Sequence, residues 1–213
     1  MSSTARGGKR SEADHYPTPA WCVDRLLEAC ALPGGRWLEP CAGEGAIAEA
    51  VLASRDDVMF DLHELRPDCL PALQRIVPDG RIALGDVLLR SPPRTRYDVV
   101  ITNPPFSSAQ PVLEWSLRAG TTVVLLLRLN FLGTRGRAAF MRRHPPDVYV
   151  LPDRPSFTGK GTDSIEYAWF VWPRERREAG TIRVLATTDK DQRQQRKPVR
   201  GPDQPAPKDA LRR

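Results

Sequence analysis

Histidine and cysteine, which often bind metals or form cross-links, are scarce in this sequence: it has three histidines and four cysteines. The cysteines, Cys22, Cys30, Cys41 and Cys69, form no Cys-x-x-Cys pair, and no histidines cluster beside them. This spacing argues against a structural zinc site and favours reduced thiols. We therefore expect a cytoplasmic protein that needs no metal.

Long apolar runs are also absent. The run at residues 123–127 is far shorter than the ~20 residues of a membrane-spanning helix and suits a buried strand. The first residues lack the apolar core of a secretory signal. With 213 residues and 40% apolar side chains, we expect one main globular domain, monomeric and without a membrane partner.

Positive charge is concentrated near the C-terminus. The formal net charge is +6, and residues 190–213 hold eight Lys or Arg and three Asp, so the rest of the chain is nearly neutral. Such a segment, rich also in Gln and Pro, is typical of disorder and of loose contact with phosphates. We expect a disordered N-terminus (1–15), a folded domain (16–188) and a basic disordered tail (189–213).

Apolar patterning predicts alternating strands and helices. Strands are expected at residues 36–40, 58–64, 81–84, 97–102, 121–127, 147–151 and 166–172, with a further edge strand at 181–186. The alternation predicts an α/β fold with a mostly parallel sheet and helices on both faces. Ligands of such sheets bind at the carboxyl ends of the strands.

The most informative stretch is Asn103-Pro104-Pro105-Phe106, directly after an expected strand. The prolines stiffen the turn and remove two N–H donors. The Asn103 side chain and the Pro104 carbonyl could then accept hydrogen bonds from an amine on a planar ring, while Phe106 stacks on that ring. Such bonds would return electron density to the amine nitrogen, which suits N-methyl transfer. The plainer alternative is a proline-rich turn with a core Phe.

A glycine loop follows the first strand, in Glu39-Pro40-Cys41-Ala42-Gly43-Glu44-Gly45. Glycines there let the backbone approach a ligand closely, and the next helix offers free N–H groups. The residues from Gly43 also fit the dinucleotide fingerprint, which is weak alone. Glu39, four residues before the first glycine, argues against a nearby pyrophosphate and for a cationic amino group.

Three more residues at expected element ends are candidates for nucleotide contacts. Glu64 could accept both hydroxyls of a ribose, or could cap a helix. Asp86 could accept from an adenine amino group, or could be a turn residue. Thr18 fits a helix N-cap with Pro19 at the first helical position, and its hydroxyl could instead lie near a ligand carboxylate.

These motifs resemble, in this order, those of class I S-adenosylmethionine-dependent methyltransferases that modify adenine N6 in DNA: Tyr16-Pro17-Thr18-Pro19, the Glu39 loop and the Asn103 turn. Residues 154–172 also resemble small phage-associated members. The resemblance covers roughly residues 16–172 and implies a Rossmann-like, seven-stranded sheet with one antiparallel strand near its edge. No segment is long enough for the large target-recognition domain of restriction-linked members.

The resemblance also implies residue roles. The catalytic turn would be Asn103, Pro104, Pro105 and Phe106. The S-adenosylmethionine contacts would be Tyr16, Thr18, Glu39, Cys41, Gly43, Gly45, Glu64 and Asp86. The nucleic-acid contacts, for which DNA is the expected partner, would be Arg128, Arg135, Arg154, Phe157 and Lys160. The loop 152–164 that holds the last three also has the composition of an ordinary surface loop.

Three other functions remain open from the sequence. The same chemistry could act on an RNA base or on a protein glutamine, although glutamine enzymes usually end the turn in Tyr rather than Phe106. The glycine loop and Glu64 would also suit a nicotinamide-dependent oxidoreductase, which leaves the Asn103 turn unexplained. The basic tail alone would suit a non-catalytic nucleic-acid-binding module.

Overall fold

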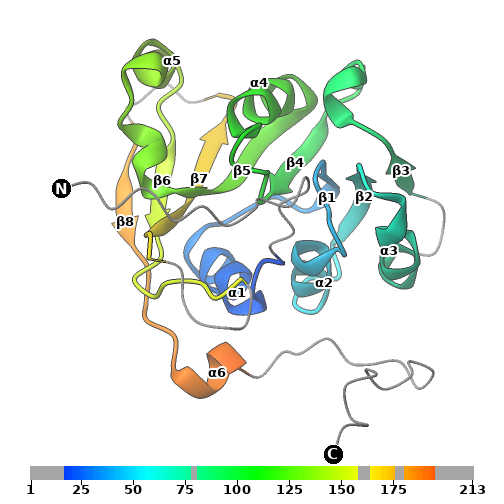
Figure 1. Cartoon of the computed structure of the whole chain (residues 1–213), viewed down its shortest axis with the longest axis horizontal. Coiled ribbons are helices and arrows are strands. Elements are labelled where there is room, and N and C mark those ends of the chain that lie inside the picture. Colours follow the sequence, from blue (N-terminus) through cyan, green and yellow to red (C-terminus); the bar gives the residue numbers. More distant parts are fainter. Residues whose placement is uncertain (1–16, 78–80, 158–163, 176–179, 195–213) are drawn as a thin grey trace, which may run out of the picture.

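An eight-stranded sheet runs through the whole of the computed structural model, which describes residues 17–77, 81–157, 164–175 and 180–194 (Figure 1). The spatial order of the strands is β3-β2-β1-β4-β5-β7-β6-β8. The strands are β1 (Gly35–Glu39), β2 (Val58–Glu64), β3 (Ile82–Leu84), β4 (Tyr97–Thr102), β5 (Gly120–Arg128), β6 (Asp147–Val150), β7 (Tyr167–Pro173) and β8 (Ile182–Val184).

Every neighbouring pair of strands is parallel except the two pairs that β7 makes, with β5 and with β6. The prediction of a mostly parallel sheet with one antiparallel strand is therefore confirmed. The seven strands that the resemblance implies are one too few, because the edge strand expected at residues 181–186 forms as β8 and pairs with β6 through Val148, Tyr149 and Val150. On this edge strand, the apolar side chains of Ile182 and Val184 are largely exposed to solvent.

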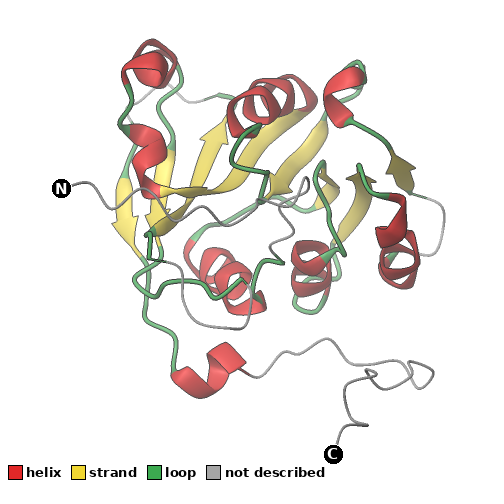
Figure 2. Ribbon diagram, viewed as in Figure 1, coloured by secondary structure: helices red, strands yellow, loops and turns green. Residues whose placement is uncertain are grey.

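Helices cover both faces of the sheet, as predicted (Figures 1 and 2). One face holds α1 (Ala20–Ala29), α2 (Ala46–Leu52) and α3 (Leu70–Ile76), and the other holds α4 (Ala109–Ala119) and α5 (Ala138–Arg143). Short 3₁₀ turns lie at η1 (Pro67–Cys69), η2 (Val87–Leu89), η3 (Leu129–Leu132) and η4 (Arg135–Arg137). No helix in the described part of the chain is long and apolar enough to span a bilayer.

Side chains along the central strand β5 point alternately to the two faces of the sheet and contribute to both halves of the core. Val124 and Leu126 point to the face covered by α1 and α2, while Val123, Leu125 and Leu127 point to the face covered by α4. All five are essentially inaccessible to solvent. The continuous apolar run thus reflects a strand buried on both faces.

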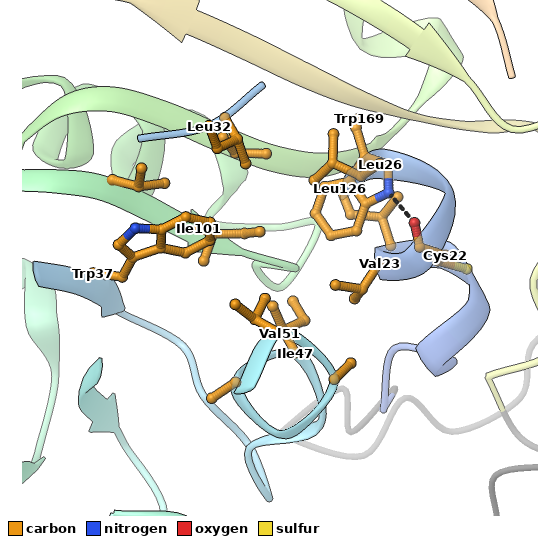
Figure 3. Packing of buried hydrophobic residues seen from close by; sticks show 14 of the residues in the cluster. Cys22, Val23, Leu26, Leu32, Trp37, Ile47, Val51, Ile101, Leu126 and Trp169 are labelled. Atoms are coloured by element: carbon orange, nitrogen blue, oxygen red, sulfur yellow. Dashed lines mark hydrogen bonds between the residues drawn. The ribbon is translucent and has the colours of Figure 1, made fainter. Parts of the chain in front are cut away.

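The α1 face is closed by contacts between segments far apart in sequence (Figure 3). Cys22, Val23 and Leu26 of α1 pack against the sheet beside Trp169 of β7. The indole Nε1–H of Trp169 donates to the backbone carbonyl of Cys22 at 2.8 Å, so the buried donor is satisfied. This bond joins the first helix to the antiparallel strand.

The chain remains ordered for a few residues beyond the predicted domain end. Asp153 holds this segment, since its Oδ2 accepts from the Thr188 N–H at 2.6 Å and its Oδ1 lies 2.9 Å from the Arg193 guanidinium. Residues Lys190–Gln194 form a short helix, α6. The composition predicted disorder from residue 189. The ion pair between Arg193 and Asp153 joins α6 to a distant loop, and composition alone cannot reveal such a contact.

Candidate active site at the carboxyl ends of the strands

A cleft of about 830 Å³ opens where the strand order reverses between β1 and β4. This is the position at which doubly wound α/β sheets bind ligands, and the volume lies within the range of small-molecule sites. The cleft collects residues from most of the predicted motifs. Its lining includes Thr18, Glu39, Cys41, Gly43, Glu64, Asp86, Asn103, Pro105, Phe106 and Arg128.

Backbone hydrogen bonds fix the ends of the strands around this cleft. The Ala42 N–H donates to the His63 carbonyl at 2.9 Å, which ties the β1 end to the β2 end. The Gly85 N–H donates to the Glu64 carbonyl at 2.9 Å and ties β2 to β3. The Thr102 hydroxyl donates to the Cys41 carbonyl at 3.4 Å and ties β4 to β1. The cleft floor is therefore built from mutually braced turns.

The glycine loop adopts the close-approach geometry expected for a ligand-binding loop. Gly43 and Gly45 have φ of 57° and 84°, in the left-handed region that favours glycine. Gly45 occupies the N-cap position of α2 and does not line the cleft itself. A Cβ on Gly45 would lie 2.3 Å from Ile76 Cδ1, so the Ile76 side chain would have to shift for any other residue there.

Glu39 is a buried carboxylate, only 2% exposed, at the end of β1. Burial raises the pKa of its carboxyl well above the ordinary range, against the hydrogen bond that the Ala48 N–H donates at 3.1 Å, and the nearby Glu64 adds to the increase. Among the described residues it has no cationic partner. A ligand with an amino cation would supply the missing charge.

Glu64 is 6% exposed and already accepts several hydrogen bonds. Its Oε2 accepts from the Gly43 N–H at 2.5 Å, and its Oε1 accepts from the Arg66 N–H and Nε–H at 2.9 Å and 3.1 Å. The carboxylate thus links the glycine loop to the β2 end, and Arg66 is a cleft residue that motif reasoning missed. Its position two residues after Glu64 is the available sequence signal.

The β3 end contributes an exposed acid with exposed apolar neighbours. Asp86 Oδ1 accepts from the Leu88 N–H at 2.9 Å, so the plainer interpretation, a turn residue, describes its present contact. Leu65 and Leu88 also line the cleft and are 61% and 36% exposed. Motif reasoning missed both leucines, although each closely follows an acid at a strand end. Together they offer apolar surface to a flat ring.

The Asn103 turn lies beside the segment ahead of α1. The Asn103 Nδ2–H donates to the Thr18 hydroxyl at 3.2 Å. Thr18 is therefore not the helix cap predicted from sequence, because Pro19 occupies the N-cap position and the Thr18 hydroxyl faces Asn103 instead. This hydrogen bond fixes the orientation of the amide that was expected to hold an amine.

Phe106 sits under a cation. The Arg128 guanidinium carbon lies 3.9 Å from the centroid of the Phe106 ring, and the Tyr167 ring is tilted beside Phe106 with centroids 6.0 Å apart. Arg128 Nε–H also donates to the Tyr167 hydroxyl at 3.4 Å. Phe106 is half-buried, so part of its ring remains accessible.

Several predicted site residues lie elsewhere. Pro104 is buried and does not line the cleft, and Arg135 is exposed in η4. Arg154 is exposed and pairs with Glu166 at 2.5 Å. Phe157, expected to contact nucleic acid, is only 8% exposed and packs edge-to-face on Tyr167, so in this structure it is a core ring. Tyr16 and Lys160 lie outside the described residues.

Cys41 contributes a neutral thiol to the cleft. Burial, together with the nearby Glu64 and Glu39 carboxyls, raises its pKa to about 12. The thiol is therefore not a thiolate nucleophile at neutral pH. Within the described part of the chain, no group of His, Cys, Asp and Glu side chains is arranged to hold a metal ion.

Comparison with known proteins identifies the fold. No protein-family model matches the sequence. A type I restriction-modification methyltransferase subunit from Streptococcus thermophilus superposes with a TM-score of 0.59 at 18% identity over 78% of this chain. A proposed RNA methyltransferase from Pyrococcus horikoshii gives 0.57 at 19% over 80%, and the 23S rRNA methyltransferase ErmE gives 0.56 at 18% over 78%.

These similarities define a Rossmann-like class I methyltransferase fold. The chain spans 46% of the restriction-modification subunit, 94% of the Pyrococcus protein and 71% of ErmE. The strand order also bears on the rival functions. Classic dinucleotide-binding sheets follow the order 3-2-1-4-5-6, whereas this sheet inserts the antiparallel β7 between β5 and β6. The topology therefore departs from that of nicotinamide-dependent oxidoreductases.

Proposed function

We propose that this protein transfers the methyl group of S-adenosylmethionine to the exocyclic N6 amine of adenine in DNA, as the small phage-associated enzymes that it resembles do. One observation carries the proposal: the Asn103 turn and the Glu39 glycine loop open onto the same cleft. An acceptor site and a nucleotide-cofactor site would thus be contiguous. S-adenosylmethionine would supply an electrophilic methyl group on a sulfonium centre.

The cleft fits this cofactor in its charge and shape. Glu39 would pair with the amino group of the methionine part, because its buried carboxylate has no cation of its own among the described residues. Glu64 would accept from the ribose, and Asp86 from the adenine amino group. Leu65 and Leu88 would pack against the adenine ring.

The acceptor amine would be held by the Asn103 turn. The Asn103 amide, oriented by Thr18, would accept a hydrogen bond from the amine, which raises electron density on its nitrogen. Pro104, which is buried and does not line the cleft, would stiffen the turn. Phe106 would stack on the base. Positioning of this kind lowers the barrier to direct transfer without a general base.

DNA is the acceptor favoured by the sequence motifs and by the similarity to restriction-modification subunits. Because the chain spans 46% of those subunits, their sequence recognition is not carried over with the fold. In duplex DNA the adenine would have to leave the stack, which costs a few kcal/mol. Arg128 in the cleft and the basic C-terminal residues would contact the phosphates.

An RNA base is the second candidate acceptor. The specific observation in its favour is the similarity to the Pyrococcus protein over 94% of that chain, since no large extra domain separates the two. The same turn would bind the adenine amine of an RNA loop, where the base is already unpaired.

One labelling experiment separates these acceptors. The protein is incubated with radiolabelled S-adenosylmethionine and DNA, RNA or unrelated protein, and the nucleic acids are then digested to nucleosides for mass analysis. We expect label in N6-methyldeoxyadenosine, and none with the Asn103→Ala variant. Label only in ribonucleosides would favour the second candidate. Label only in protein, or none, would contradict the proposal.

A further inference from the structure

The guanidinium of Arg128 occupies a place that a stacked base would need. Its central carbon lies 3.9 Å from the centroid of the Phe106 ring, which is the spacing of a stacked planar group. Both residues line the cleft, so the contact lies within it. A base cannot share a ring face with a guanidinium at this distance. The two planar groups must therefore compete for this face of Phe106.

Little else holds Arg128 on the ring. In the described part of the chain it makes no ion pair, and its hydrogen bond to the Tyr167 hydroxyl is long, at 3.4 Å. The other arginines near this end of the sheet are occupied: Arg66 pairs with Glu64 at 3.1 Å and Arg154 pairs with Glu166. A guanidinium carries several N–H donors suited to phosphate. Arg128 is thus the cleft cation available to an incoming anion.

We propose that Arg128 is a placeholder for the target base: it covers Phe106 in the free protein, leaves when the base enters, and then binds a backbone phosphate beside the flipped nucleotide. This inference rests on the proposed function, because it assumes that Phe106 receives the base. The exchange keeps the ring covered before substrate arrives. It also couples base entry to a phosphate contact. A free base must break the contact between Arg128 and Phe106 without gaining a phosphate contact in return.

The test uses a base that carries no phosphate. Adenosine binding is measured by calorimetry, with S-adenosylhomocysteine in saturating excess so that the cofactor pocket is closed to adenosine. Arg128→Ala removes the guanidinium from the Phe106 ring, and we expect the variant to bind adenosine roughly fivefold more tightly, the factor expected from removing one exposed cation–π contact. Adding Phe106→Ala to this variant should abolish the gain.

A single-stranded oligonucleotide tests the phosphate contact. For Arg128→Ala, the slope of log affinity against log salt should become shallower by about 0.7, the value for one phosphate contact on single strands. Tighter adenosine with a shallower salt slope is the signature of the exchange.

The chain offers a matched control. Arg137 lies over the Phe131 ring, 4.2 Å from its centroid, and neither residue lines the cleft. Arg137→Ala removes a similar cation–π contact and should leave both readouts unchanged. Unchanged or weaker adenosine binding by folded Arg128→Ala would overturn the placeholder. Methyl transfer by the unmodified protein is measured separately, and its absence from every nucleic acid would refute the proposed function instead.

Discussion

Two side chains set the chemistry of this cleft through their hydrogen bonds and burial. Asn103 is oriented by the Thr18 hydroxyl, and Glu39 is a carboxylate enclosed by protein with one backbone N–H donor. In the proposed function, the first arrangement would present a polar group of fixed direction to the acceptor amine. The second resists ionisation because it is buried, and a cationic ligand would favour its charged form. Each leads to a distinct prediction.

Removing the Asn103 amide should slow methyl transfer much more than it weakens cofactor binding. For Asn103→Ala we expect kcat to fall by at least ~10²-fold, as for the loss of one preorganised polar group. The affinity for S-adenosylhomocysteine should change little, because Glu39 and Glu64 remain. The measurements are single-turnover kinetics and calorimetry. Normal turnover by this variant would remove Asn103 from the mechanism.

Glu39→Gln should raise the stability of the ligand-free protein while it weakens cofactor binding. The folded protein holds the Glu39 proton more tightly than the unfolded chain does, because burial raises the pKa of this carboxyl. Stability from this group is therefore greatest at low pH and is lost as pH rises towards the raised pKa. Gln keeps an acceptor for the Ala48 N–H without the charge. In the absence of ligand, the variant should melt at a higher temperature than the wild type, by a margin that grows with pH.

The same substitution should weaken S-adenosylmethionine binding by on the order of tenfold, because one charge-assisted hydrogen bond is lost. Wild-type binding should also release a proton from Glu39, so its measured enthalpy should depend on the ionisation enthalpy of the buffer. Glu39→Gln should show no such dependence. Equal affinities and equal buffer dependence would place the cofactor amino group elsewhere.

Among the elements, the turn from β1 into α2 is constrained at Gly45 by its backbone conformation. Gly45→Ala forces an L-residue to φ 84° and brings a Cβ to 2.3 Å from Ile76 Cδ1. We expect the free energy of unfolding to fall by about 1–2 kcal/mol from the backbone conformation alone, and cofactor affinity to fall as Gly43 shifts. Denaturant titration measures the first effect. Gly133→Ala, with no atom within 4 Å of its Cβ, is the control and should change little.

The strands, the helices and the strand ends could be predicted from the sequence because they depend on the local pattern of apolar and polar residues. Residues 58–64 alternate in burial along β2 and end at Glu64, as the sequence indicated. Contacts between distant segments could not be predicted. The Thr18–Asn103 hydrogen bond joins residues 85 positions apart, and Phe157 is buried because Tyr167 lies beside it. Local composition carries no information about such partners, so a helix cap at Thr18 and a nucleic-acid contact at Phe157 were expected instead.

At the scale of the whole molecule, the charge asymmetry of the chain bears on nucleic-acid binding. Residues 195–213, outside the described part of the structure, hold six Lys or Arg and two Asp. The preceding residues up to Gln194 belong to the folded unit, since Arg193 pairs with Asp153. A truncation after Gln194 therefore removes cationic charge while it keeps α6 and all the cleft residues.

Such a truncation should weaken DNA binding to a similar extent for all sequences, because phosphate contacts do not read bases. Each lost contact should reduce the slope of log affinity against log salt by about 0.9 on duplex DNA. Methylation of a saturating short oligonucleotide should persist, since Asn103, Phe106 and Arg128 are retained. Fluorescence anisotropy of labelled DNA at several salt concentrations gives the slope. If affinity and slope are unchanged, these residues make no phosphate contact, and Arg128 with the other basic residues of the folded domain must supply the electrostatic attraction.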